Sequence, residues 1–184
     1  DINKSIHYFS LAANQNHPIA QRMLGIFYLY AVYNKINKIK AIDYFIQSAS
    51  NGDKYSHFAV GYFYHEGKYV EQDIKKSIHH YKEASTFNIH FAKNNLGVIY
   101  RFGCENQTSP NCGISMDYFE EAIKRFQDKV SMYNMAHIYI YEDKNTSRLK
   151  KSIELLIESI KLDFSPSTEL LCIALIKLFG LILI

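Results

Sequence analysis

The sequence repeats itself at an interval of 36 residues, and this interval constrains the fold more than any other feature. Gly25, Gly61 and Gly97 stand 36 residues apart, each opens a four-residue segment that ends in Tyr, and Ala136 begins a weaker fourth copy. A second, apolar series has spacings of 36, 36, 38 and 37: Phe9, Phe45, Tyr81, Phe119 and Leu156. A fixed period of about 20 to 50 residues is typical of tandem arrays whose units pack on their neighbours.

Each period predicts a pair of antiparallel helices. In its second half, Ile42, Phe45 and Ala49 recur at steps of three and four, which places them on one face of a helix. The first half has the same pattern with Leu24 and Phe27. We therefore expect an all-α chain whose core forms between successive helices.

The recurrent glycine predicts a close contact between helices. Glycine costs about 1 kcal/mol relative to alanine inside a helix, so its return at one phase suggests that no β-carbon fits at Gly25, Gly61 and Gly97. Three tyrosines fall in the repeated phase next to the core, and packing is the role we expect for them: Tyr8, Tyr44 and Tyr118.

The connector of the second repeat carries signals for the end and the start of a helix. Gly67 suits a helix C-terminus, and Asp73 suits the N-cap of the next helix. Asn37 occupies the phase of Asp73 one repeat earlier. The first and fourth connectors lack this glycine.

These residues resemble the Sel-1-like repeat, an αα-hairpin related to the tetratricopeptide repeat. The similarity rests on Asn16-x3-Ala20-x3-Leu24-Gly25-x2-Tyr28 and on Gly67-x2-Val70-x2-Asp73-x2-Lys76-Ser77-x3-Tyr81-x2-Ala84. A tetratricopeptide repeat has a tighter connector and a period of about 34 residues. The resemblance implies a right-handed αα-superhelix, that is, a solenoid. The units we expect are a second helix over 1–17, repeats over 18–53, 54–89, 90–128 and 129–164, and a partial repeat over 165–184.

Charge and motifs argue against nucleic-acid binding and catalysis. The net charge is only +3 and the lysines are scattered, whereas phosphate binding needs a concentrated basic surface. His79 and His80 are adjacent, so they point about 100° apart on a helix and cannot chelate one metal together. No P-loop, GxSxG, GxGxxG or HExxH motif occurs. We expect no enzyme activity, no metal and no cofactor.

The resemblance implies a noncatalytic scaffold or adaptor that binds proteins or peptides, for example in endoplasmic-reticulum-associated degradation or in activation of a membrane enzyme. An alternative is the regulatory or substrate-binding arm of a larger enzyme whose catalytic domain lies outside this fragment. A further alternative is an array that associates with itself through its terminal face.

In the family, the first helix of each repeat lines the concave side. Positions there that vary between repeats are free to contact a partner, and aromatic and Arg side chains dominate binding hot spots. The predicted groove residues are Arg22, Phe58, Tyr62, Arg101, Phe102, Tyr133 and Tyr141. Packing between repeats is the alternative role for several of them.

The longest connector holds the other candidate residues. Cys104 and Cys112 flank a Pro-containing turn and either form a disulfide or stay as thiols, and Asn106 begins an N-glycosylation sequon between them. A zinc site is not expected, because the loop has no CxxC and no His. These signals favour the secretory pathway or the endoplasmic reticulum over the cytoplasm.

The two ends of the sequence suggest a piece of a longer protein. The sequence begins in the middle of a repeat, without an initiator Met. The segment 170–184 is almost wholly apolar, but it falls short of the roughly 20 residues that cross a bilayer. We expect a truncated fifth repeat with Ala174 at the phase of Ala136, and the start of a membrane anchor is the alternative.

Overall fold

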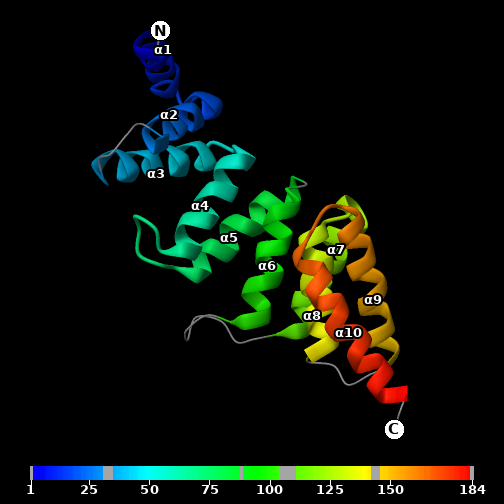
Figure 1. Ribbon diagram of the computed structural model, residues 1–184. Coiled ribbons are helices and arrows are strands. Elements are labelled where there is room, and N and C mark those ends of the chain that lie inside the picture. Colours follow the sequence, from blue (N-terminus) through cyan, green and yellow to red (C-terminus); the bar gives the residue numbers. More distant parts are fainter. Residues whose placement is uncertain (1, 31–34, 88, 104–110, 142–145, 183–184) are drawn as a thin grey trace. The chain divides into compact units, whose positions relative to one another are not determined.

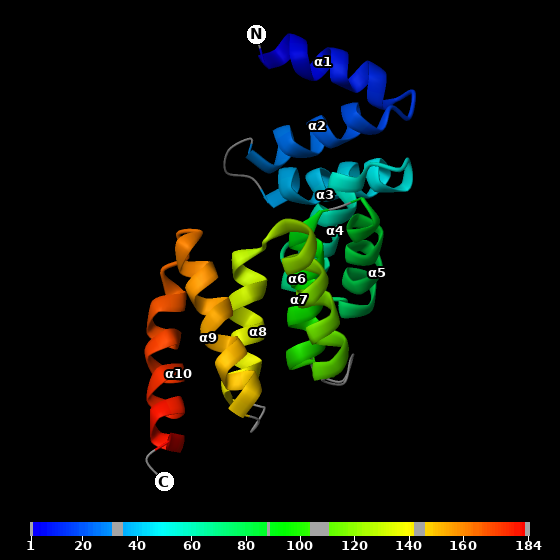
Figure 2. The same cartoon turned by 90° about the vertical axis from the view of Figure 1, so that its right-hand side faces the viewer.

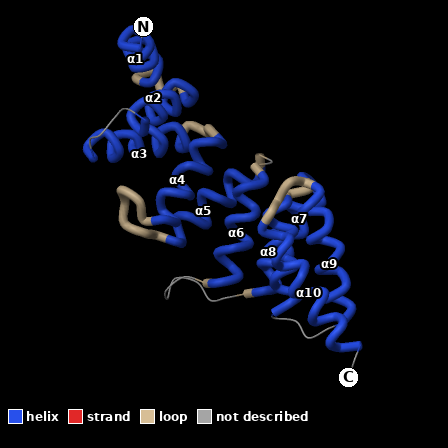
Figure 3. The backbone as a smooth tube through the Cα atoms, viewed as in Figure 1, coloured by secondary structure: helices blue, strands red, loops and turns tan. Residues whose placement is uncertain are grey.

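The computed structural model describes residues 2–30, 35–87, 89–103, 111–141 and 146–182, and these residues form helices joined by turns and loops, without a strand (Figures 1 and 3). Ten α-helices occur in this part of the chain: α1 (Ile2–Ala13), α2 (Pro18–Tyr30), α3 (Lys35–Ser50), α4 (Lys54–Glu66), α5 (Ile74–Thr86), α6 (His90–Phe102), α7 (Cys112–Phe126), α8 (Lys129–Tyr141), α9 (Thr146–Lys161) and α10 (Pro166–Ile182). The all-α prediction is confirmed.

The helices form two compact units, Asp1–Ala92 and Lys93–Ile184. In the first unit α1 packs on α2, α2 on α3, α3 on α4, and α4 on α5. In the second unit α7 packs on α8, α8 on α9, and α9 on α10, and these helices lie side by side in Figure 2. We call α2, α4, α6, α8 and α10 the first helices, and α1, α3, α5, α7 and α9 the second helices.

The two series of the sequence are the two sides of one repeated contact. A β-carbon on Gly25 would stand 3.0 Å from the ring of Phe45, and one on Gly97 would stand 2.5 Å from the ring of Phe119. In the fourth repeat the small residue is Ala136, which shares a core cluster with Leu156. The predicted lack of space for a β-carbon is confirmed at the glycines.

A serine on the second helix reinforces this contact. Ser77 Oγ donates a hydrogen bond to the carbonyl oxygen of Gly61 at 2.8 Å, and Ser115 Oγ donates to that of Gly97 at 2.7 Å. Both serines are fully buried, so the bonds satisfy hydroxyl groups that would otherwise be costly to bury.

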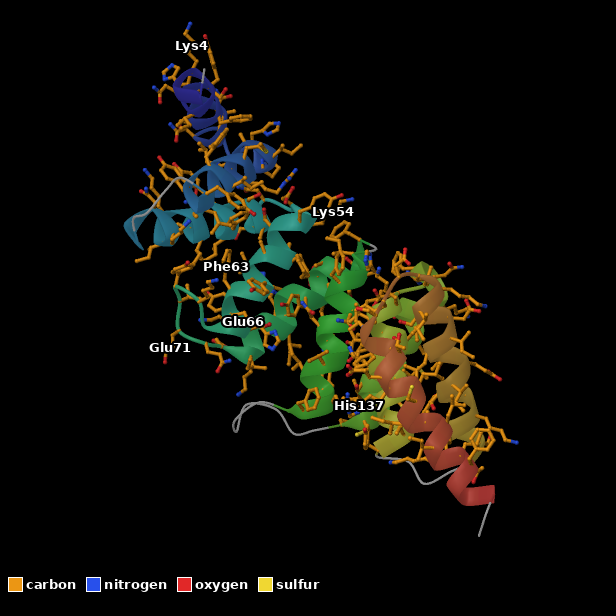
Figure 4. The ribbon with its side chains drawn as sticks, viewed as in Figure 1. Lys4, Lys54, Phe63, Glu66, Glu71 and His137 are labelled. Atoms are coloured by element: carbon orange, nitrogen blue, oxygen red, sulfur yellow. The ribbon has the colours of Figure 1, made fainter. Side chains whose placement is uncertain are left out.

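The aromatic ring of a second helix also contacts the first helix that follows it. The rings of Phe9 and Phe27 lie 5.9 Å apart at 47°, and those of Phe45 and Phe63 repeat the same distance and angle. Phe63 is labelled in Figure 4. The ring of Phe45 therefore joins its own repeat to the next one, and full burial of such a side chain contributes about 1.5 to 3 kcal/mol.

Two of the three tyrosines expected to pack do so. Tyr44 stacks on Tyr28 with the ring centroids 5.6 Å apart, and Tyr118 stacks on Tyr100 at 5.7 Å. The expectation is wrong for Tyr8, which is 68% exposed, because α1 packs mainly on α2 and this side chain lies away from that contact.

The signals in the second connector are confirmed. Gly67 ends α4 in the left-handed conformation, with φ at 62°. Asp73 is the N-cap of α5, and its carboxylate accepts a hydrogen bond from the amide of Lys76 at 2.9 Å. Asn37 does not have the equivalent role, because α3 begins at Lys35 and includes it.

A repeated serine pair fixes the register of α10. Ser56 Oγ donates to Ser48 Oγ at 2.8 Å where α3 meets α4, and Ser167 Oγ donates to Ser159 Oγ at the same distance where α9 meets α10. All four hydroxyl-bearing residues are buried. Ser167 is therefore the structural equivalent of Ser56.

This register corrects the phase expected for the last helix. Cys172 follows Ser167 by five residues, as Gly61 follows Ser56, so Cys172 rather than Ala174 takes the place of the small residue. Ala174 instead lies two residues further along the helix, where it packs in the core against α9.

Candidate partner-binding surface

One face of the first helices carries the residues predicted to form a groove. In each helix the face consists of one residue in the first turn and the residues three, seven and eleven positions after it. This spacing places all four on one side of the helix. We call this set the first-helix face, and it comprises Ile19, Arg22, Ile26, Tyr30, Tyr55, Phe58, Tyr62, Glu66 and Phe91 in the first unit, and Asn94, Val98, Phe102, Val130, Tyr133, His137 and Tyr141 in the second.

The starting position of this face presents exposed apolar side chains that the sequence analysis missed. Ile19, Tyr55 and Phe91 are 36 residues apart, and each stands about half exposed in the first turn of its helix. Their spacing was visible in the sequence, because large apolar residues repeat there at the same interval as the glycines. The groove residues predicted from the sequence start three residues later, at the phase of Arg22.

The second position of the face joins each repeat to the next. In the first unit, Arg22 Nε lies 3.2 Å from a carboxylate oxygen of Asp53, and the Arg22 guanidinium lies 5.2 Å from the ring centre of Tyr55. Phe58 is equivalent to Arg22, and its ring lies 6.3 Å from that of Phe91. These side chains thus contact the beginning of the following first helix.

The second unit repeats this arrangement with different chemistry. The amide oxygen of Asn94 accepts hydrogen bonds from Ser131 Oγ at 3.2 Å and from Asn134 Nδ2 at 3.1 Å. The ring of Tyr133 lies 5.7 Å from that of Phe164. When the residue at this phase changes from one repeat to the next, the residue that it contacts changes as well. Variation at this phase therefore does not by itself indicate a binding partner. A partner contact by Arg22, Phe58 or Tyr133 stays a prediction.

The far end of the face is open to solvent. Tyr30, Phe102 and Tyr141 occupy the same phase near the ends of their helices, and they are 75%, 64% and 49% exposed. Glu66 takes this place in α4, at the opposite end of that helix from Lys54 (Figure 4). Tyr62 lies one turn earlier and is 40% exposed. A partner can reach these residues directly, as it can the half-exposed Ile19, Tyr55 and Phe91 at the other end of the face.

Arg101 has a different position from its neighbour Phe102. It is only 7% exposed, and one of its guanidinium nitrogens lies 2.5 Å from Nδ1 of His137. Because a guanidinium only donates hydrogen bonds, this geometry requires a neutral His137 whose Nδ1 accepts. Arg101 also lies 4.7 Å from the ring centre of Phe102. Its direct contribution to partner binding stays a prediction, and its visible contacts orient the exposed ring.

His137 connects Arg101 to a second exposed ring. The ring of His137 lies 4.4 Å from that of Tyr141, and Lys177 Nζ lies 4.5 Å from the centre of the Tyr141 ring. Lys177 Nζ also donates a hydrogen bond to the carbonyl oxygen of Ile140 at 2.9 Å. His137 projects from α8 in Figure 4. Neither His137 nor Lys177 was predicted as a site residue. Both nevertheless stand at positions in their helices that correspond to positions of the first-helix face, and for His137 this could have been read from the sequence.

A pair of histidines in the first unit lies outside this face. Nδ1 of His57 in α4 and Nδ1 of His80 in α5 are 3.0 Å apart. Burial lowers the pKa of His80 to about 4, with smaller contributions from His57 and His79. Burial also lowers the pKa of His57. Within the described ranges, no group of three His, Cys, Asp or Glu side chains has a geometry that could hold a metal ion.

The candidate residues of the long connector are mostly outside the described part of the chain. Cys104 and Asn106 lie in the range 104–110, which the structure does not describe, and Cys112 is the partly buried first residue of α7. The disulfide between Cys104 and Cys112 and the glycosylation of Asn106 stay predictions. No described helix has the length and hydropathy that would let it cross a membrane.

Comparison with known proteins gives this architecture a family. The model of the Sel1 repeat matches residues 1–17, 18–53, 54–86, 90–125 and 129–163. A sel1-like repeat-containing protein of Acanthamoeba polyphaga mimivirus is 33% identical over 99 residues, which cover 54% of this chain and 17% of that protein. The chitin synthase regulator SKT5 of Saccharomyces cerevisiae is 25% identical over 149 residues, covering 76% of this chain and 21% of that protein.

Solved structures agree with this assignment. A Sel1 repeat protein from Oxalobacter formigenes superposes with a TM-score of 0.74 at 18% identity, covering 91% of this chain and 67% of that one. A protective antigen of uropathogenic Escherichia coli with an SLR fold also gives a TM-score of 0.74, at 21% identity and covering 88% of this chain and 34% of that one. The chain spans about a fifth of the two curated relatives. From its repeats, its helix contacts and these matches, the chain belongs to the Sel1 repeat family.

Proposed function

We propose that this chain is a noncatalytic scaffold that binds another protein through the first-helix face. Sel1 repeats generally mediate interactions between proteins. The observation that carries the proposal is the exposure of aromatic side chains at a repeated phase, with Tyr30, Phe102 and Tyr141 as its members. Exposed aromatic residues grouped on one face are typical of protein-binding surfaces.

The packing around these residues supports a preformed surface. The guanidinium of Arg101 lies against the ring of Phe102, and Lys177 and His137 lie against the ring of Tyr141. Side chains held in this way lose less conformational entropy when a partner binds than freely rotating ones would. The same rings contribute little to the core, so binding and folding are separable.

Cross-linking in cells tests the proposal. The full chain is expressed with the single substitutions Tyr62→Ala and Phe102→Ala, and cross-linked proteins are identified by mass spectrometry. We expect both variants to lose a protein that the parent chain captures, while circular dichroism and the melting temperature stay close to those of the parent. Tyr8→Ala is the matched control, because Tyr8 is an exposed tyrosine on a second helix. Equal capture by all three variants would contradict the proposal.

A second candidate function is regulation of an enzyme that is a separate protein. It is favoured by the match to SKT5, which is named as a regulator of chitin synthase and is similar over 76% of this chain. An enzyme among the captured proteins, with its activity changed by addition of the purified chain, would support this role. Recruitment in endoplasmic-reticulum-associated degradation stays a prediction from the sequence alone.

A further inference from the structure

Acidic residues are scarce on the first helices. Helices α2, α6 and α8 contain no Asp or Glu, α4 has only Glu66 at its last position, and α10 has only Glu169 in its first turn. The same helices carry basic residues along their length, namely Arg22, Lys54, Lys93, Arg101, Lys129 and Lys177. The carboxylates of the described helices are concentrated on the second helices, for example in α7 and α9.

Some of these cations are neutralised inside the protein. Arg22 pairs with Asp53, and Lys93 pairs with Glu121 across 2.6 Å between Nζ and a carboxylate oxygen. Lys129 forms no ion pair with a described residue, and its Nζ donates to the carbonyl oxygen of Leu162 instead. Lys54 and Lys177 likewise form no ion pair with any residue that the structure describes. These two lysines therefore leave a positive charge on the first helices without a carboxylate beside it.

In the first unit, Lys54 lies among exposed rings. Its Nζ is 5.3 Å from the ring centre of Tyr55 and 6.0 Å from that of Phe87. Both rings are about half exposed, and the Arg22 guanidinium lies on the Tyr55 ring as well. Attraction between the ammonium group and the π-faces holds the lysine near the rings while its charge stays accessible.

The second unit has the same combination at a different residue. Lys177 is exposed, its Nζ lies 4.5 Å from the ring centre of Tyr141, and that ring is about half exposed. The hydrogen bond from Lys177 Nζ to the carbonyl oxygen of Ile140 fixes the ammonium group at the end of α8. The two compact units thus each present a positioned ammonium group beside an exposed tyrosine.

We propose that the first-helix face of each unit, together with Lys54 beside Tyr55 in the first unit and Lys177 beside Tyr141 in the second, binds an acidic peptide segment that also carries bulky apolar side chains. The inference rests on the proposed function and adds the chemical class of the partner. In each unit the apolar side chains of such a segment lie on the exposed rings, and its carboxylates pair with Lys54 in the first unit or with Lys177 in the second. Such pairs at the edge of an interface raise the association rate and the selectivity, and they weaken as salt screens the charges.

A peptide fits this surface better than a nucleic acid does. Lys54 and Lys177 lie on separate units, each beside exposed rings, and the one other cation on the Tyr55 ring, Arg22, is paired with Asp53. Phosphate backbones require a continuous row of basic groups, because their affinity comes from releasing many counterions. A short peptide with acidic and apolar residues matches the single unpaired lysine and the exposed ring beside it in each unit.

Fluorescence anisotropy with defined probes tests the inference. The probes are a labelled peptide of Glu, Leu and Phe, the same peptide with Lys in place of Glu, and a single-stranded DNA oligonucleotide, each titrated with the full chain at low and high salt. We expect the acidic peptide to bind most tightly and to lose affinity at high salt. Equal or tighter binding of the basic peptide or of the DNA would overturn the inference, as would no binding of the acidic peptide.

Charge reversal locates the binding site. Lys54→Glu and Lys177→Glu are each expected to raise the Kd of the acidic peptide about tenfold, which corresponds to about 1.4 kcal/mol. The matched controls are Lys75→Glu and Lys124→Glu, which reverse exposed lysines on the second helices α5 and α7. Equal loss in the controls would show a general charge effect and would also overturn the inference.

These outcomes separate the inference from the proposed function. If Tyr62→Ala and Phe102→Ala abolish capture of the cellular partner while Lys54→Glu and Lys177→Glu leave it unchanged, the first-helix face binds a partner that is not acidic. In that case the proposed function stands and only the chemical class of the partner falls.

Discussion

The ring of Tyr81 occupies the space that a side chain on Gly61 would need, since a β-carbon at residue 61 would stand 2.8 Å from Cδ1 of that ring. Tyr81 is fully buried, so its ring has no free direction in which to move. The fourth repeat has a slightly larger residue on the first helix and a smaller one on the second, since Ala136 shares a core cluster with Leu156. The size of the residue on the first helix thus varies inversely with the size of the residue that it contacts on the second helix.

The first prediction concerns the glycine itself. Gly61→Ala should destabilise the protein by about 1 to 3 kcal/mol, because overpacking of a buried contact outweighs the gain of about 1 kcal/mol in helix propensity. Chemical denaturation measures the change. Gly180→Ala is the control, because a β-carbon there meets nothing within 4 Å and the substitution should be neutral or stabilising. A stabilised Gly61→Ala variant would contradict the close contact.

The second prediction is a rescue that copies the fourth repeat. Gly97→Ala alone should be more disruptive than Gly61→Ala, because its β-carbon would stand 2.5 Å from the Phe119 ring. Adding Phe119→Leu recreates the pair of Ala136 and Leu156 and should recover part of the loss. A double-mutant cycle should give a favourable coupling of about 1 to 3 kcal/mol. Additive effects of the two substitutions would argue against a direct contact.

The third prediction concerns the histidine pair and pH. The pKa of His80 is lowered from 6.5 to about 4, so the folded protein favours the neutral ring. As the pH falls from 6.5 towards 4, the unfolded chain takes up a proton that the folded chain does not, and the free energy of unfolding decreases. Well above pH 6.5 both states are neutral at this residue, and it contributes no pH dependence.

His80→Tyr tests this origin. Tyr44 and Tyr118 occupy the position of His80 in other repeats, and each stacks on a tyrosine of the first helix. The substitution therefore introduces a residue that this position already accepts. His80 already stacks on Tyr64 at 6.1 Å, so the variant should fold. Thermal melts between pH 7.5 and 4.5 should show a smaller loss of stability for the variant than for the parent. Parallel curves would assign the pH dependence to other groups.

The fourth prediction concerns the contact between Arg22 and Asp53. Arg22→Phe introduces the residue found at this phase in the next repeat, but it leaves a largely buried carboxylate without its cation. We expect a loss of about 1 to 3 kcal/mol, the usual cost of leaving a buried polar group with too few partners. Lys161→Ala is the control, because it removes an exposed ion pair with Glu158 and should cost less than about 1 kcal/mol. A neutral Arg22→Phe would show that the junction tolerates either residue.

The period and the second connector could be predicted from sequence because their residues have narrow structural roles. Gly67 adopts a positive φ, which a residue with a β-carbon rarely does, and Asp73 offers a carboxylate to the free amides of a helix start. Asn37 also offers a side-chain oxygen acceptor at the same phase, yet α3 already begins at Lys35. An N-cap signal specifies where a helix can start, and the neighbouring residues decide whether it starts earlier.

The register of α10 could not be read from hydrophobicity, because nearly every position after Leu170 is apolar and no periodic pattern separates its faces. The buried bond between Ser167 and Ser159 sets the register instead. The role of the predicted groove residues could likewise not be read from the sequence. Variation between repeats pointed to the phase of Arg22, but only the contacts with Asp53 and Phe91 reveal that this phase also joins repeats.

The junctions formed by Arg22, Phe58, Asn94 and Tyr133 have a consequence for how such a chain can change. These contacts are an ion pair with Asp53, which is the last residue of the same repeat, a ring pair with Phe91, hydrogen bonds with Ser131 and Asn134, and a ring pair with Phe164. A copy of the repeat 18–53 would carry Asp53 along with Arg22, whereas a copy of the repeat 90–128 would keep the contacts of Asn94 only if the next repeat supplied Ser131 and Asn134 or their equivalents. Duplication of a repeat therefore preserves the contacts whose two partners are copied together and changes those whose partner lies in the neighbouring repeat.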